Sequence, residues 1–181
     1  IDNYHRNNLN HILEVKDCQT YLLARLDQLR QVIPTLSVNG QEIFLDYIAE
    51  KNDVLIQIPD LVVKLSVGKS KTIRTKATSL LSKLKPNDSQ KYLNEFLLEG
   101  SSQERSFSAD LLARLGADNL AVLEQALAQE KLKAVQQNLQ MAIQRLKSVD
   151  SADQTQHFDI PEQVPLVVQK IPQSFTQDIL D

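Results

Sequence analysis

The sequence predicts an all-α fold, an α-solenoid of stacked antiparallel helix pairs, and three observations support this prediction. First, the 181 residues include 28 Leu and 19 Gln but only four Gly and no Trp, a composition typical of helical proteins and not of turn-rich β-sandwiches or barrels. Second, apolar residues recur at the three- and four-residue spacing of amphipathic helices. Third, a block of similar sequence returns every 31 residues, which indicates a repeat architecture.

Residues 1–38 are predicted to form an N-terminal capping helix, or two such helices, ahead of the repeats. The stretch 6–32 is strongly amphipathic, and its apolar side chains would cover the open end of a solenoid. The alternative is a partner-binding helix, because an array cut from a longer one leaves an apolar face bare. The chain begins with Ile1 and not with Met, so we expect it to be part of a longer protein.

Three similar blocks, at residues 79–84, 110–115 and 141–146, define the repeat in residues 39–147. A helix pair of this length cannot bury its apolar face alone, so we expect successive pairs to stack on one another. Other positions that keep the 31-residue step are Leu61, Tyr92 and Leu123, then Leu65, Phe96 and Leu127, and Arg74 with Arg105.

The helix limits follow from the apolar spacing and from the turn residues. Gly100 and Gly116 follow helical stretches, where we expect left-handed C-terminal caps. Ser101 and Glu104 have the spacing of a capping box. Pro59 either kinks the second helix or marks the first turn of a shorter one. The predicted helices span residues 41–50, 54–67, 70–84, 88–99, 101–115, 119–130 and 132–147.

Residues 148–181 are predicted to be an acidic, Pro-containing tail or linker. They carry one Lys against six Asp and Glu, and they show little helical periodicity. One alternative is that the segment packs across the last repeat through its apolar residues. Another is that it is attracted to the basic residues 64–85. The apolar residues in question are Val164, Leu166, Val167, Val168 and Ile171.

The first complete repeat resembles a HEAT or HEAT-like repeat. The sequence LVVKL at residues 61–65 matches the apolar first helix, and KTIRTKA at residues 71–77 matches the Ile/Val-Arg-x-x-Ala pattern that opens the second. The next unit keeps Arg105, whereas the third has Gln136 in place of the Arg. The chain is also similar to the helical arrays of large bacterial multidomain proteins of the molybdate-metabolism-regulator-like type. These resemblances imply an interaction scaffold without chemistry of its own.

Residues 64–85 form a basic block, with seven Lys and Arg and no Asp or Glu, although the whole chain has a net charge of −3. Such a block is either a solvated helix face or a contact for an acidic partner. The HEAT-like resemblance implies that the second helix of each pair, here residues 70–84, lines the concave side. The candidate partner-binding residues are therefore Lys69, Lys71, Arg74, Lys76 and Arg105.

The function that we expect is a non-enzymatic interaction scaffold that binds a protein partner, or a neighbouring domain of its own chain, through the concave face. The alternative is a module that binds the nucleic-acid backbone through the basic helix 70–84. Some HEAT-like repeat proteins are DNA glycosylases, which use a Trp near the damaged base, and this chain has no Trp. We therefore predict no enzymatic activity.

Neither a cofactor, a metal site nor a small-molecule substrate is predicted. Gly68-Lys69-Ser70 lacks the first Gly of a phosphate-binding loop, and His5, His11 and Cys18 match no zinc-binding spacing. No apolar run approaches the roughly 20 residues of a membrane helix. With a single cysteine and no secretory leader, the cytoplasm is the expected location.

Overall fold

The computed structural model of the protein describes residues 13, 15 and 17–153, and in this part of the chain every regular element is helical. The absence of strands from these residues confirms the all-α prediction for them. The α-helices are α2 (Cys18–Leu23), α3 (Leu26–Val32), α4 (Val38–Glu50), α5 (Asn52–Leu55), α6 (Pro59–Ser66), α7 (Lys71–Leu81), α8 (Pro86–Glu99), α9 (Ser102–Leu115), α10 (Leu120–Gln129) and α11 (Lys133–Asp153). Short 3₁₀ helices are η1 (Ile33–Thr35) and η2 (Ala117–Asn119).

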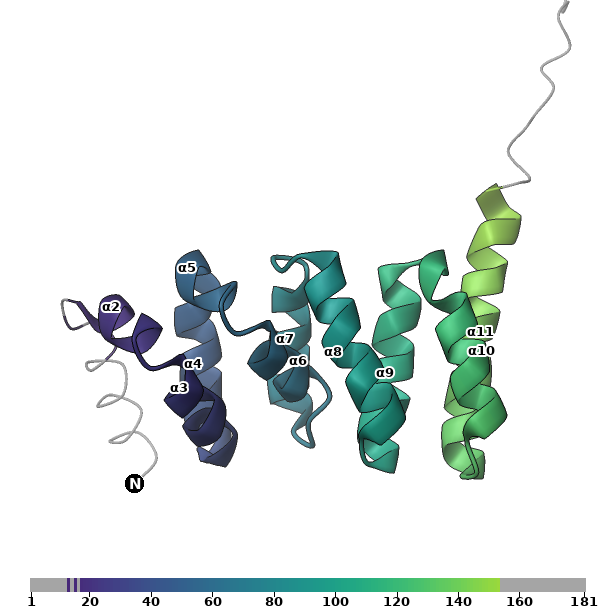
Figure 1. Ribbon diagram of the computed structural model, residues 1–181, viewed down its shortest axis with the longest axis horizontal. Helices are drawn as coiled ribbons and strands as arrows, with labels where there is room; N and C mark the ends of the chain where they lie inside the picture. The colour runs from purple at the N-terminus through teal and green to yellow at the C-terminus, as the bar shows by residue number, and fades with distance from the viewer. Residues whose placement is uncertain (1–12, 14, 16, 154–181) are drawn as a thin grey trace, which may run out of the picture.

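The helices follow one another in sequence order along the long axis of the molecule (Figure 1). Within successive pairs, α6 packs on α7, α8 on α9, and α10 on α11. Between pairs, α6 contacts α8 and α8 contacts α10, while α4 contacts α7 and α9 contacts α11. Helices α7 and α9 lack a comparable backbone contact, and this difference positions the candidate site.

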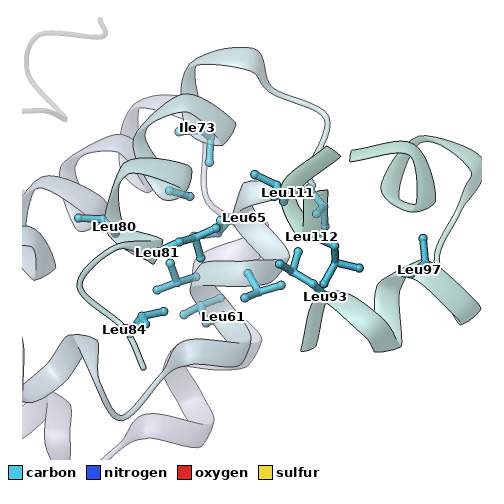
Figure 2. Packing of buried hydrophobic residues seen from close by; sticks show 14 of the residues in the cluster. Leu61, Leu65, Ile73, Leu80, Leu81, Leu84, Leu93, Leu97, Leu111 and Leu112 are labelled. Carbon is cyan, nitrogen blue, oxygen red and sulfur yellow. The ribbon is translucent and has the colours of Figure 1, made fainter. Parts of the chain in front are cut away.

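The hydrophobic core extends through both helices of each pair and from one pair to the next. Figure 2 shows this packing between α6, α7, α8 and α9, whose leucines meet in one cluster. Fully buried leucines cost roughly 2–5 kcal/mol each when truncated to Ala, so this cluster is a major source of stability. Members of the cluster that are labelled in Figure 2 are Leu61, Leu65, Ile73, Leu80, Leu81, Leu84, Leu93, Leu97, Leu111 and Leu112.

Burial follows the predicted 31-residue step over most of the three sequence blocks. Their second and third positions are buried in every block. The last position is buried at Leu84 and Leu146, but Leu115 between them is 39% exposed. Leu115 directly precedes Gly116, whose φ of 128° turns the chain out of α9. The buried second and third positions are Leu80 and Leu81, Leu111 and Leu112, and Ala142 and Ile143.

Pro59 starts a new helix and does not kink a longer one. It occupies the first helical position of α6, where its missing N–H has no intrahelical partner to lose. The predicted helix at residues 54–67 is therefore divided into the short α5 and α6. At the other end, α11 continues to Asp153, past the predicted helix end at residue 147, because residues 148–153 contain neither Pro nor Gly.

The glycine and capping predictions are only partly correct. The left-handed conformation expected at Gly100 is wrong, because its φ is −68° and its ψ is 167°. Glycine fits there for a steric reason, since an added Cβ would collide with the Phe96 carbonyl oxygen and would lie 2.9 Å from the Glu104 Cβ. Gly116 does have a positive φ. The capping box is confirmed: Glu104 N donates to Ser101 Oγ at 3.4 Å, and Ser101 N donates to Glu104 Oε2 at 2.8 Å.

Helices α2 and α3 fall within the predicted N-terminal cap, and His5 and His11 lie outside the described residues. Arg30 of α3 joins this region to the array. Its Nε donates to Asp60 Oδ2 at 2.8 Å, and its Nη2 donates to the Gln57 carbonyl at 2.9 Å. These two hydrogen bonds hold α3 beside the N-terminal end of α6. None of the helices in the described ranges is long and apolar enough to cross a bilayer.

Candidate functional site

Three side chains at equivalent positions of the repeat hold the turn inside each helix pair. Arg74 Nη1 donates to two carbonyl oxygens of the α6–α7 turn, at 2.7 and 2.9 Å. Arg105 Nη1 donates to a carbonyl of the α8–α9 turn at 2.7 Å, and Gln136 Nε2 to one of the α10–α11 turn at 2.6 Å. Helix ends leave carbonyls without intrahelical partners, so these donors stabilise the turns. Gln136 therefore performs the same local role as the Arg that it replaces.

Arg105 also forms an ion pair with Glu130, which follows α10. Its Nε and Nη2 donate to the two carboxylate oxygens of Glu130 at 2.7 and 3.3 Å. The Glu130 side chain is only 8% exposed, and its Oε1 also accepts from the backbone N–H groups of Lys131 and Leu132 at 2.9 Å. The hydrogen bond from Arg105 is the main reason why the pKa of Glu130 lies below its usual value. Arg105 therefore serves as an internal link between consecutive helix pairs.

The other predicted lysines differ in their surroundings. Lys76 Nζ lies 2.7 Å from Asp46 Oδ1 and 3.0 Å from Glu42 Oε1, both on α4. Burial alone would lower the pKa of Lys76, but the hydrogen bonds to these carboxylates raise it. Lys69 and Lys71 are exposed, and within the described part of the chain neither forms an ion pair. Of the five predicted binding residues, only these two lysines are exposed and without an internal ionic partner.

Two adjoining hollows run along α9, and together we call them the α9 groove. One, of about 280 Å³, lies between α7 and α9, and the other, of about 240 Å³, lies between α9 and α11. Phe107 and Asp110 line both hollows, so the two hollows adjoin at these side chains of α9. The full lining is Ser66, Lys71, Arg74, Thr75, Thr78, Ser106, Phe107, Asp110, Leu111, Arg114, Asn138, Met141, Ala142 and Arg145.

Cations outnumber carboxylates in the α9 groove. Its lining holds Lys71, Arg74, Arg114 and Arg145 against Asp110 alone. Asp110 Oδ2 accepts from Arg114 Nη2 at 2.7 Å, and Asp110 Oδ1 accepts from Arg145 Nη1 at 2.5 Å. A guanidinium has five N–H donors, and the side chains of Arg114 and Arg145 are 59% and 49% exposed, so both retain donors that face solvent.

The floor of the groove combines an aromatic ring with a stacked cation. The Arg74 guanidinium carbon lies 4.0 Å from the centroid of the Phe107 ring, which is cation–π geometry. Met141, 56% exposed, adds an apolar and adaptable surface beside it. An apolar floor between cationic rims suits an extended segment that carries both apolar side chains and carboxylates.

The sequence-based choice of binding residues missed Phe107, Arg114 and Arg145. A signal for the two arginines was present, because both occupy the fifth position of the repeat blocks, together with Lys83. Lys83 itself is used internally, since its Nζ donates to the Ala49 carbonyl at 2.7 Å. No comparable signal identified Phe107, whose importance depends on Arg74 lying over its ring.

A further hollow, of about 540 Å³, lies between α2 and α4 and is lined in part by Cys18, Tyr47, Asp46 and Glu50. Burial, with a smaller effect of the neighbouring Cys18, raises the pKa of Tyr47. Cys18 itself is half-buried against the core, in keeping with a structural thiol. Among the residues that the structure describes, no three His, Cys, Asp or Glu side chains are grouped as a metal site would require.

Comparison of the chain with protein-family models, with curated protein sequences and with solved structures gave no match. The HEAT-like resemblance therefore stays a prediction from the sequence, and the function has to be argued from the α9 groove itself.

Proposed function

We propose that the chain is a HEAT-like α-solenoid that acts as a non-enzymatic scaffold and holds an acidic, extended segment of a protein partner in the α9 groove. The observation that carries this proposal is the composition of the groove lining, where Lys71, Arg114 and Arg145 outnumber the single carboxylate of Asp110 beside the half-buried Phe107 ring and the exposed Met141 thioether. The stacking of helix pairs in sequence order is consistent with a solenoid (Figure 1).

The geometry favours carboxylates as the anchoring groups of the partner. Arg114 and Arg145 each pair with Asp110 through one guanidinium nitrogen. Their other N–H donors face solvent, where a second carboxylate can bind. Lys71 adds a flexible charge at the opposite rim. Rim charges of this kind determine the association rate and specificity more than the affinity, so the apolar floor supplies the remaining contact energy.

The alternative of a nucleic-acid module receives less support from the positions of the basic side chains. Backbone binding needs several free cations along one face. Here Arg74 is engaged with carbonyls and Phe107, and Lys76 is paired with two carboxylates. Lys64 lies on α6, in the other helix layer. The basic block of the sequence is therefore not a continuous free surface of α7.

The proposal is tested with a fluorescein-labelled peptide of Glu-Pro-Val repeats, followed by fluorescence anisotropy. In the full chain, the double charge reversal Lys71→Glu and Arg114→Glu should weaken binding about tenfold or more, because two attractive contacts become repulsive. The matched control is Lys133→Glu, which reverses an exposed charge outside the groove lining. Circular dichroism checks that each variant is folded.

A variant that gives Arg114 a new ion-pair partner within the chain tests the same groove in a second way. Asp110 and Arg145 pair across a separation of 35 residues, and the same separation places Ser79 opposite Arg114 in the repeat. Ser79→Asp should give Arg114 an internal partner on α7 and weaken peptide binding, whereas Ser82→Asp adds the same charge elsewhere. Equal peptide affinity for wild type, Ser79→Asp and the double charge reversal would disprove the proposal. Preference for duplex DNA over the peptide would favour the alternative.

A further inference from the structure

We infer that the acidic segment which occupies the α9 groove is residues 154–181 of the same chain. This inference rests on the proposed function, because it identifies the partner of that groove as the chain itself. The segment would then occupy the groove in an autoinhibitory contact, and an external acidic partner would have to displace it.

Charge and side-chain type match on the two sides of this contact. Residues 154–181 carry Asp159, Glu162, Asp178 and Asp181 against Lys170 alone. The groove has the opposite balance, with cations in excess over Asp110. Asp159 and Glu162, three residues apart, lie shortly before the apolar run at residues 164–168. This order supplies carboxylates for the guanidinium rim and then aliphatic groups for the floor.

The length of the chain permits contact between residues 154–181 and the α9 groove. Helix α11, which carries Arg145, forms one wall of the groove and extends beyond its neighbours at the C-terminal end (Figure 1). From Arg145 to Asp153 the helix rises about 12 Å over eight residues. The six residues from Asp153 to Asp159 reach at most about 20 Å when extended. Asp159 can therefore return to the level of Arg145.

The sequence of the segment also lowers the cost of binding in an extended form. Pro161 and Pro165 fix their own φ angles and disfavour helical backbone at the residue before each. Less conformational entropy is then lost when the segment lies in the groove. Short tethers give effective concentrations in the millimolar range, so a weak contact is populated within one chain. This argument favours the same chain over a second copy.

The first experiment compares ¹H–¹⁵N spectra of the full wild-type chain with those of the double variant Asp159→Asn and Glu162→Gln. Release of the segment should shift the backbone signals of Phe107 and Asp110 and the side-chain Nε–H signal of Arg114. The matched control, Asp178→Asn with Asp181→Asn, removes the same charge from the segment but keeps the two proposed contact residues. It should leave these signals in place.

The second experiment measures binding of the labelled Glu-Pro-Val peptide to the same chains. The Asp159→Asn and Glu162→Gln variant should bind the peptide about three- to tenfold more tightly than wild type, because two surface ion pairs no longer compete. The control variant should bind as wild type does. High salt, which screens exposed ion pairs, should produce the same spectral shifts in wild type as the double variant does at low salt.

The outcomes separate this inference from the proposed function. Unchanged groove signals, together with equal peptide affinity for wild type and the double variant, would overturn docking of the segment while leaving the groove as a peptide site. Absence of peptide binding even to the double variant would overturn the proposed function, and the spectra alone would then decide on the segment. Shifts that grow with protein concentration would identify a second copy as the occupant and refute a contact within one chain.

Discussion

Replacement of Arg105 by Met should destabilise the protein by about 3 kcal/mol, because it removes an ion pair that is largely shielded from water. The substitution deletes two hydrogen bonds to Glu130 and one to the Gly100 carbonyl. Loss of one partner from a buried pair costs roughly 3–5 kcal/mol. Glu130 keeps two backbone N–H donors, so its carboxylate is not left without partners and the lower end of this range applies.

Two other arginines provide matched comparisons for the same substitution. Arg74→Met loses two carbonyl hydrogen bonds and the contact of the guanidinium with Phe107, but it leaves no carboxylate unpaired, so about 1.5 kcal/mol is expected. Arg114→Met removes an exposed ion pair within one helix and should cost less than about 0.5 kcal/mol. The expected order of destabilisation is Arg105, then Arg74, then Arg114.

The assay is urea denaturation followed by far-ultraviolet circular dichroism, with the m-value compared between variants to check that the transition is of the same kind. A double-mutant cycle of Arg105→Met with Glu130→Gln isolates the pair, and we expect a coupling free energy of about 1–2 kcal/mol. The reasoning would be refuted by an Arg105→Met variant no less stable than Arg114→Met, or by a coupling free energy near zero.

Three further predictions concern stability. First, because the folded-state pKa of Glu130 is lowered, its stabilisation is present above the unfolded-state pKa and is lost as the pH falls through the folded-state value. Urea titrations at descending acidic pH should therefore show a smaller loss of stability for Glu130→Gln than for wild type. Second, Gly100→Ala should lower stability by about 2 kcal/mol through steric overlap, whereas Gly68→Ala, with its nearest contact at 3.4 Å, should change it by less than about 1 kcal/mol; thermal melts of both compare them. Third, Leu93→Ala should cost about 3 kcal/mol and Leu98→Ala, at a residue 58% exposed, under about 0.5 kcal/mol; equal urea midpoints would contradict the packing described here.

Most of the fold was accessible from the sequence because helical burial is periodic. The 31-residue step identified buried positions in three consecutive helix pairs, and the capping box fixed the start of α9. Helix boundaries were harder to predict from the sequence where they depend on tertiary contacts. The division of α5 from α6 follows from Pro59, which left two alternatives open. The need for glycine at position 100 comes from the close approach of the Phe96 carbonyl and of Glu104, which the sequence does not reveal.

The candidate site was less predictable, because a count of charges contains no information about their partners. Arg74 and Arg105 looked like free cations in the sequence, yet both reach back to turn carbonyls of their own helix pair. The partner of Arg105, Glu130, lies 25 residues away and belongs to the next pair. Gln136 looked like a departure from the repeat, but its amide makes the equivalent contact. The position of a residue within the 31-residue step therefore predicted its contacts better than its charge did.

The α9 groove can be explained by one missing carboxylate in the repeat. Where the earlier helix carries an acidic residue, neighbouring helices of successive pairs are linked by ion pairs: Lys76 reaches Asp46 on α4, and Arg145 reaches Asp110 on α9. The residue equivalent to Asp110 on α7 is Ser79, which has no charge to offer Arg114. Arg114 therefore pairs within its own helix, and α7 and α9 are left without the link that joins the other pairs. The absence of a carboxylate at Ser79 thus contributes to the excess of cations along the groove.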